Sequence, residues 1–149
     1  MSRGLNLIIV DDDPTVCVVL AEMVKRFYTW GEVLSFTNAD EATLFCQTRE
    51  AGVAIFVLDV FLGKKSGFAF LETILNKFPM AYQDTIMVTG NASNDVVDRC
   101  VSSDITYLLE KPIRPYALQL AIRAIVAKYV KFAKKLLQDP LFAENVARF

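Results

Sequence analysis

Short apolar runs alternate along the chain with longer segments in which apolar residues recur every three or four positions. The runs are rich in branched side chains, typical of strands buried on both faces of a sheet, and lie at residues 5–10, 32–36, 53–59, 85–89 and 106–112. The periodic segments predict helices with one apolar face, at about residues 14–27, 38–49, 68–78, 93–101 and 115–137. Because each predicted strand is followed by a predicted helix, the sequence predicts an α/β fold, with a five-stranded parallel sheet and helices on both faces.

Polar side chains end four of these strands. They are Asp11, Asp12 and Asp13 after the first strand, Asp59 after the third, Thr89 after the fourth and Lys111 after the fifth. Ligands of open α/β sheets bind outside the carboxyl ends of the strands, so we expect these side chains to converge. Clustered carboxylates favour a hard cation such as Mg²⁺, and a hydroxyl and an ammonium beside it suit a phosphoryl group. One aspartate, Asp13, is also placed to cap the helix that Pro14 opens.

Composition narrows the chemistry further. The chain has no histidine, which excludes Ser-His or Cys-His catalysis and a phosphohistidine of its own. The net charge of -1 gives no global signal for nucleic acid. Three widely spaced cysteines in apolar segments are expected to be reduced core residues. No apolar run is long enough for a membrane span, and we expect a cytoplasmic protein.

Four motifs together resemble the receiver domain of two-component response regulators. They are "LIIVDDDP", "FVLDVFLGKKSG", "IMVTG" and "EKPI", and the resemblance spans about residues 6–127. It implies a flavodoxin-like (βα)5 fold with strand order 2-1-3-4-5. Residues 1–127 would form the receiver domain, and residues 128–149 a C-terminal helical extension or linker.

The resemblance also assigns roles to the strand-end residues. Asp59 would be the phosphoacceptor, and Asp11 and Asp12 would hold Mg²⁺ together with Asp59 and the backbone carbonyl of Phe61. Thr89 would bind a phosphoryl oxygen and move with it, while Lys111 would pair with the phosphoryl group or with Asp59. The bond before Pro112 would be cis. The donor would be a sensor histidine kinase or a histidine phosphotransfer protein, and the chain would be no enzyme beyond self-phosphorylation and self-dephosphorylation.

Three positions depart from the family pattern. Gly63 stands where a proline is usual, which predicts a more mobile loop. The aromatic switch position, three residues before Lys111, holds Leu108, and Tyr107 lies one residue earlier. Because side chains alternate along a strand, Tyr107 is expected on the other face unless a bulge intervenes. Phe61 is bulky, and we expect it to shield an acyl phosphate and slow self-dephosphorylation.

Two other functions fit parts of the sequence. Asp11-Asp12-Asp13-Pro14-Thr15 matches the motif of haloacid-dehalogenase-type phosphatases, with Asp11 as nucleophile and Asp13 as acid/base. That family needs a further acidic motif after the lysine, whereas no Asp or Glu lies between Pro112 and Gln138, and Asp59 would have no role. A degenerate receiver acting only as an interaction module is the second alternative, which the intact Asp59, Thr89 and Lys111 argue against.

The output side is less determined. Lys128, Lys131 and Lys135 share a helical face in the extension, which fits a solvated face, a dimerisation helix or the start of a linker to an output domain beyond residue 149. The resemblance further suggests a phosphorylation-biased surface, and a homodimer, through the fourth helix, fifth strand and fifth helix. Direct nucleic-acid binding is not expected, because no recognition module accompanies the lysines.

Overall fold

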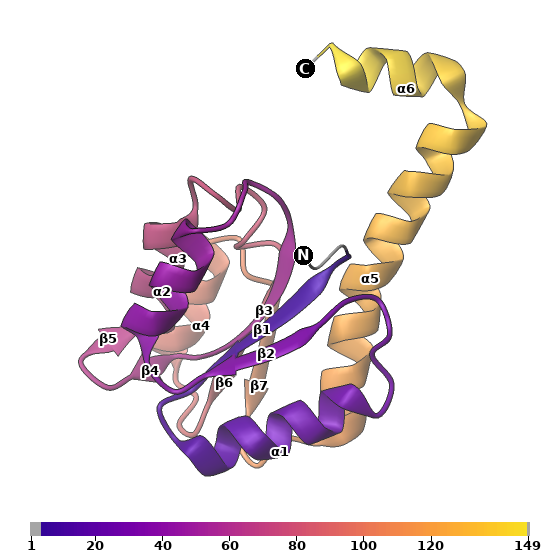
Figure 1. Ribbon diagram of the computed structural model, residues 1–149. Coiled ribbons are helices and arrows are strands. Elements are labelled where there is room, and N and C mark those ends of the chain that lie inside the picture. The colour runs from indigo at the N-terminus through magenta and orange to yellow at the C-terminus, as the bar shows by residue number, and fades with distance from the viewer. Residues whose placement is uncertain (1–3, 149) are drawn as a thin grey trace.

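A parallel sheet forms the centre of the protein (Figure 1). The computed structural model describes residues 4–148. The strands of the sheet are β1 (Asn6–Val10), β2 (Val33–Phe36), β3 (Ala54–Asp59), β6 (Thr85–Thr89) and β7 (Tyr107–Glu110). Their spatial order is β2-β1-β3-β6-β7. Since β6 and β7 are the fourth and fifth strands of this sheet along the chain, the predicted order 2-1-3-4-5 is confirmed.

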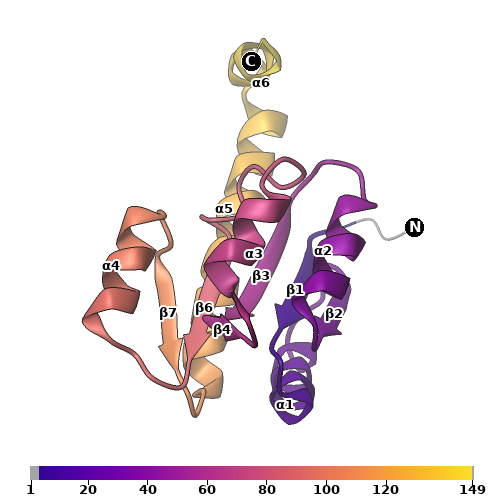
Figure 2. The same cartoon turned by 90° about the vertical axis from the view of Figure 1, so that its left-hand side faces the viewer.

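Helices cover both faces of the sheet (Figures 1 and 2). One face carries α1 (Pro14–Lys25) and α5 (Pro115–Gln138), and the other carries α2 (Ala39–Gln47), α3 (Gly67–Ile74) and α4 (Asn94–Ser102). A sixth helix, α6 (Pro140–Ala147), follows α5. No helix in the range 4–148 combines the length and apolar character that crossing a bilayer requires.

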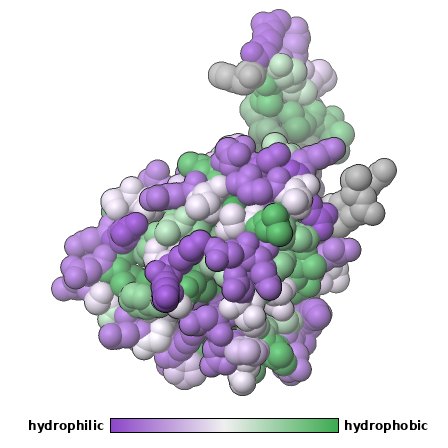
Figure 3. Space-filling view, turned by 60° about the vertical axis from the view of Figure 1, so that its left-hand side comes forward, coloured by the Kyte–Doolittle hydropathy of each residue, from purple (hydrophilic) through white to green (hydrophobic). Residues whose placement is uncertain are grey.

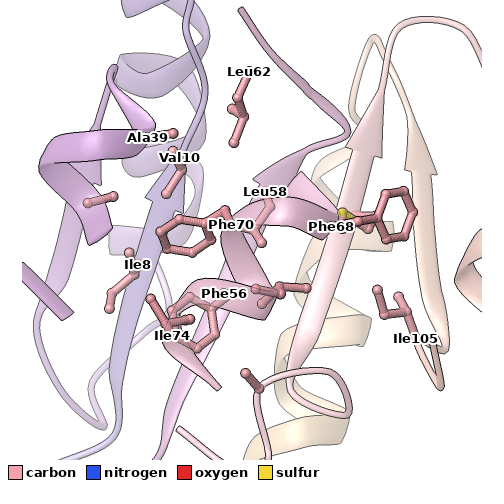
Figure 4. Packing of buried hydrophobic residues seen from close by; sticks show 14 of the residues in the cluster. Ile8, Val10, Ala39, Phe56, Leu58, Leu62, Phe68, Phe70, Ile74 and Ile105 are labelled. Atoms are coloured by element: carbon pink, nitrogen blue, oxygen red, sulfur yellow. The ribbon is translucent and has the colours of Figure 1, made fainter. Parts of the chain in front are cut away.

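The alternating side chains of the strands divide the apolar interior into two cores. Ile8, Phe56 and Met87 face α2, α3 and α4, where Phe56 packs edge-on against Phe70 and Phe78 (Figure 4). The residues next to them in each strand face α1 and α5. Both faces of the inner strands are therefore buried, which explains their continuous apolar runs. The three cysteines are reduced and buried in these cores, as expected.

Three of the predicted helix starts are confirmed by side-chain hydrogen bonds. The Asp13 carboxylate accepts from the Thr15 N–H, and Pro14 is the first residue of α1. The side chains of Asn38 and Ser93 cap α2 and α4 in the same way. Asp13 is thus occupied as the cap of α1. Elsewhere in the chain, the peptide bond between Lys111 and Pro112 is cis, as the resemblance implied.

The segment after β3 was expected to be a loop, and that prediction was wrong. Residues 61–66 form a small antiparallel hairpin, with β4 (Phe61–Leu62) paired to β5 (Lys65–Ser66). Gly63 takes a positive φ of 63° at its turn, a conformation that glycine adopts without steric cost. The Lys65 ammonium binds the Asp40 carboxylate at the start of α2, which ties the hairpin to that helix.

Gly67 lies just before the helix predicted at residues 68–78, but it is the first residue of α3, because Ser66 caps that helix. A side chain at this position would also be too close to the strand that ends in Asp59. A Cβ on Gly67 would lie 2.6 Å from the Asp59 carbonyl oxygen. This close contact lets α3 begin directly beside the end of β3.

Helix α5 passes the predicted domain boundary at residues 127 and 128 without a break. Just beyond that boundary, the Lys128 ammonium and the Tyr129 hydroxyl both donate to the carboxylate of Asp84, whose side chain is buried directly before β6. A solvated face was one of three possibilities for Lys128, and its ion pair with Asp84 shows that this lysine also anchors the helix to the domain. The boundary itself stays a prediction, but the contacts of the sheet with α5 reach Tyr129.

The rest of the extension projects from the domain (Figures 1 and 3). The Phe142 ring of α6 packs edge-on against Phe132 of α5, with 6.0 Å between ring centroids. Asp139 caps α6 and also pairs with Lys135 at 3.0 Å. Leu137 and Leu141 remain exposed, and the face in Figure 3 shows apolar surface on this projection.

Candidate functional site

Two aspartates meet where β1 and β3 end side by side. The strands pair in parallel with Val10 opposite Leu58, so Asp11 and Asp59 follow at the same edge of the sheet. Asp11 is 1% exposed and Asp59 is 7% exposed. Two buried carboxylates this close together require positive charge nearby.

Lys111, which follows β7, supplies that charge. Its ammonium donates to Oδ2 of Asp59 at 2.7 Å and to Oδ2 of Asp11 at 2.9 Å. The remaining oxygens accept backbone N–H groups: Asp13 donates to Oδ1 of Asp11 at 2.9 Å, and Phe61 donates to Oδ1 of Asp59 at 3.0 Å. All four carboxylate oxygens therefore have a donor, and the predicted convergence of Asp11, Asp59 and Lys111 is observed.

The shared ammonium does not fully compensate for the burial of Asp11. Desolvation raises the pKa of the Asp11 carboxyl, against the hydrogen bonds from the Asp13 N–H and Lys111 that lower it; the charge of Asp59 also raises it. Burial alone would lower the pKa of Lys111, but its hydrogen bonds to Asp59 and Asp11 and their charges raise it. The site thus stabilises the ammonium and holds an excess of negative charge.

That excess suits a divalent cation. Carboxylate oxygens of Asp11, Asp12 and Asp59 lie within 4.8 Å of one another, and Asp12 is exposed to solvent. Hard oxygen ligands of this kind, with room for water on one side, are the set that Mg²⁺ prefers. The Phe61 backbone lies beside Asp59 through its N–H, and its carbonyl as a further ligand remains a prediction.

Thr89 ends β6 on the other side of Asp59. Its side chain is fully buried, and its Oγ1 accepts the N–H of Asn91 at 3.2 Å. Its carbonyl accepts the Lys111 N–H at 2.8 Å, so the ends of β6 and β7 are joined. Thr89 therefore reaches the site edge as predicted, with its hydroxyl hydrogen available for a further acceptor.

The register of β7 decides which side chain takes the switch position. Leu108 pairs with Met87 and packs against the core under α2, α3 and α4. Tyr107 packs on the opposite side, in the core under α1 and α5. Each residue of β7 pairs with one residue of β6, with no bulge. The expectation that Tyr107 faces away from the switch side is confirmed.

Comparison with known proteins identifies this arrangement. Residues 7–123 match the family model described as "Response regulator receiver domain". The chain belongs to this family. The predicted recognition and function, a receiver domain of the two-component response regulators, are thereby confirmed.

Curated relatives are response regulators from bacteria and plants. Heme response regulator HssR of Staphylococcus saprophyticus is 25% identical over 122 residues, which are 82% of this chain and 51% of HssR. Two-component response regulator ARR11 of Arabidopsis thaliana is 29% identical over 125 residues, which are 84% of this chain and 23% of ARR11. The receiver chain thus spans about half of HssR and less than a quarter of ARR11.

Solved receiver structures share the fold. A response regulator receiver domain protein from Clostridium thermocellum superimposes with a TM-score of 0.73 at 19% identity, covering 86% of this chain and 98% of that chain. CheY4 of Vibrio cholerae gives a TM-score of 0.69 at 19% identity, covering 82% and 98%. At this identity the likeness concerns the fold, and the site roles rest on the geometry described above.

Sequence reasoning missed one residue of the receiver site. Glu110, directly before Lys111, accepts the Ala92 N–H through Oε2 at 3.2 Å. Its place next to this loop could have been predicted, because Glu110 ends β7 and therefore lies beside the loop that follows the neighbouring strand β6. Its role could not be inferred without the course of that loop.

Proposed function

We propose that Asp59 accepts a phosphoryl group from the phosphohistidine of a sensor histidine kinase or a histidine phosphotransfer protein. An oxygen of Asp59 attacks phosphorus, the phosphorus–nitrogen bond breaks, and the departing imidazole takes up a proton. The observation that carries the proposal is the Lys111 ammonium, 2.7 Å from Asp59 and 2.9 Å from Asp11 at the joined strand ends. A fixed cation at this point stabilises the charge on a transferring phosphoryl group.

The remaining residues have distinct roles in this proposal. Asp11, Asp12, Asp59 and the Phe61 carbonyl would hold Mg²⁺, which would neutralise charge on the phosphoryl oxygens. Lys111 would move from the free carboxylates to a phosphoryl oxygen, and the Thr89 hydroxyl would donate to another. The phosphoryl group makes the charge at Asp59 more negative, about -2 in place of -1, and adds acceptor oxygens.

The output would pass through the surface formed by α4, β7 and α5. Leu108 occupies the position of the aromatic switch, so the usual coupling of a threonine to an aromatic ring is absent in this proposal. The receiver would instead change its surface through the loop between β6 and α4. A homodimer through this surface and an output domain beyond residue 149 remain parts of the proposal, and no direct nucleic-acid contact is included.

Phe61 is proposed to govern the lifetime of the phosphoryl group. Phe61 is 58% exposed at the start of the hairpin, and its N–H is bonded to the Asp59 carboxylate. A large apolar side chain at this place restricts the approach of water to an acyl phosphate. We therefore propose slow self-dephosphorylation, with no catalytic activity on other substrates.

The alternative phosphatase function has less support from the geometry. Asp13, its required acid/base, is occupied as the cap of α1, accepting the Thr15 N–H at 2.9 Å. Asp59, which has no role in that alternative, is instead the carboxylate nearest to the Lys111 ammonium.

Phosphorylation from a small acyl phosphate with Mg²⁺, followed by mapping of the labelled residue, tests the proposal. We expect label at Asp59 that disappears in Asp59→Asn. Label or phosphate release that survives this substitution and depends on Asp11 would favour the phosphatase. A protein that takes up no label would support the interaction module.

A further inference from the structure

We propose that Glu110 is a positioning residue that holds the loop between β6 and α4 in its resting place and thereby limits phosphoryl binding. The Glu110 carboxylate accepts the Ala92 N–H at 3.2 Å. The neighbouring Asn91 N–H is bonded to the Thr89 hydroxyl, also at 3.2 Å. Two successive amides of the loop are thus held by side chains from the ends of two strands.

The two strand ends form a fixed frame for this loop. Thr89 and Glu110 are paired in register, and the Lys111 N–H donates to the Thr89 carbonyl at 2.8 Å. Figure 2 shows the loop leaving β6 at this edge and turning outward to α4, beside β7. The loop leads directly to Ser93, the cap of α4. A change in the loop is therefore transmitted to the start of α4.

The inference rests on the proposed function, because it concerns the response of the same site. For Thr89 to reach a phosphoryl oxygen on Asp59, its hydroxyl would turn toward Asp59, and in this proposal the loop bonded to that hydroxyl through the Asn91 N–H moves with it. The bond between Glu110 and Ala92 opposes that shift, since it fixes the next residue of the loop to β7. With Leu108 at the aromatic position, Glu110 is the polar side chain of β7 that contacts this loop.

Affinity for beryllofluoride with Mg²⁺, a phosphoryl mimic, measures the effect. Glu110→Ala removes the acceptor, and we expect binding about three- to tenfold tighter than wild type, which is the size of one ordinary hydrogen bond at an exposed position. Glu110 is exposed, so the variant is expected to fold, which a thermal melt verifies.

Glu110→Gln is the matched control. It also removes the negative charge, which by itself would favour an anion, but its amide oxygen can still accept the Ala92 N–H. We expect Glu110→Gln to bind close to wild type. Equal tightening in Glu110→Ala and Glu110→Gln would overturn the inference in favour of simple charge repulsion. No change, or weaker binding, in Glu110→Ala would also overturn it.

Two further measurements separate this inference from the function on which it rests. The amide proton resonance of Ala92 should shift upfield in Glu110→Ala and stay near its wild-type position in Glu110→Gln. In a Thr89→Ala background, Glu110→Ala should no longer tighten binding, because the hydroxyl that pulls the loop is gone; a persisting effect contradicts the coupling. If wild type itself fails to bind beryllofluoride, the proposed function fails as well.

Discussion

Replacing Tyr129 by phenylalanine should destabilise the receiver fold from a point far from its phosphorylation site. The Tyr129 hydroxyl donates to one oxygen of the buried Asp84 carboxylate, while Lys128 binds the other. Without the hydroxyl, one carboxylate oxygen loses its donor in a place that is closed to solvent. Such a loss costs about 1–3 kcal/mol, and we take about 2 kcal/mol because Lys128 still neutralises the charge.

Urea unfolding followed by circular dichroism measures this change. We expect the free energy of unfolding to fall by about 2 kcal/mol with an unchanged slope, which corresponds to a melting temperature lower by about 4–8 °C for a chain of this size. Tyr116→Phe is the control, because the Tyr116 side chain lies on the same helix but is 85% exposed. If both variants lose the same stability, the contact with Asp84 does not contribute and the reasoning is refuted.

Three other predictions concern the site and the extension. Burial raises the pKa of the Asp11 carboxyl above its unfolded value of about 4. The stability that comes from this shift is therefore complete below about pH 4 and is lost as the pH rises through the folded pKa. Without metal, the unfolding free energy of Asp11→Asn should decline less with pH in this range than that of wild type, and the same decline in both proteins would contradict the shift. Phe61→Ala should shorten the lifetime of the phosphoryl group severalfold in a phosphate-release assay, whereas Tyr116→Ala should not; an unchanged lifetime argues against shielding. A chain ending at Ala127 should be about 3–5 kcal/mol less stable to urea than one ending at Phe132, because it leaves the buried Asp84 carboxylate without the Lys128 and Tyr129 donors. Equal stability of the two chains would place the limit of the fold at Ala127.

The sheet and the core of the site could be predicted because their signals are local. Buried strands have apolar runs, and the carboxyl ends of parallel strands share one edge, so Asp11, Asp59 and Lys111 had to lie near one another once the strand order was known. The order itself came from the resemblance to receivers. Tyr107 could be assigned to the opposite face from strand alternation alone.

The elements that were missed depend on contacts between distant parts of the chain or on very short segments. Strands of two residues, as in the hairpin after Asp59, are too short to show alternation. The ion pair between Asp84 and Lys128 joins residues 44 positions apart, and no local pattern indicates it. Helix α6 is an exception: it was not predicted as a separate helix, although Asp139 followed by Pro140 is a typical local signal of a cap and a first helical residue.

The unbroken course of α5 past the sheet makes the extension sensitive to helical phase. From Tyr129, the last residue anchored to the sheet, to the end of the helix at Gln138, the axis advances by about 14 Å. Each residue in that stretch also turns the direction of α6 by about 100°. Deleting one residue there would point Phe142 and its neighbours to another side of the receiver, whereas inserting seven would lengthen the arm and nearly restore its orientation.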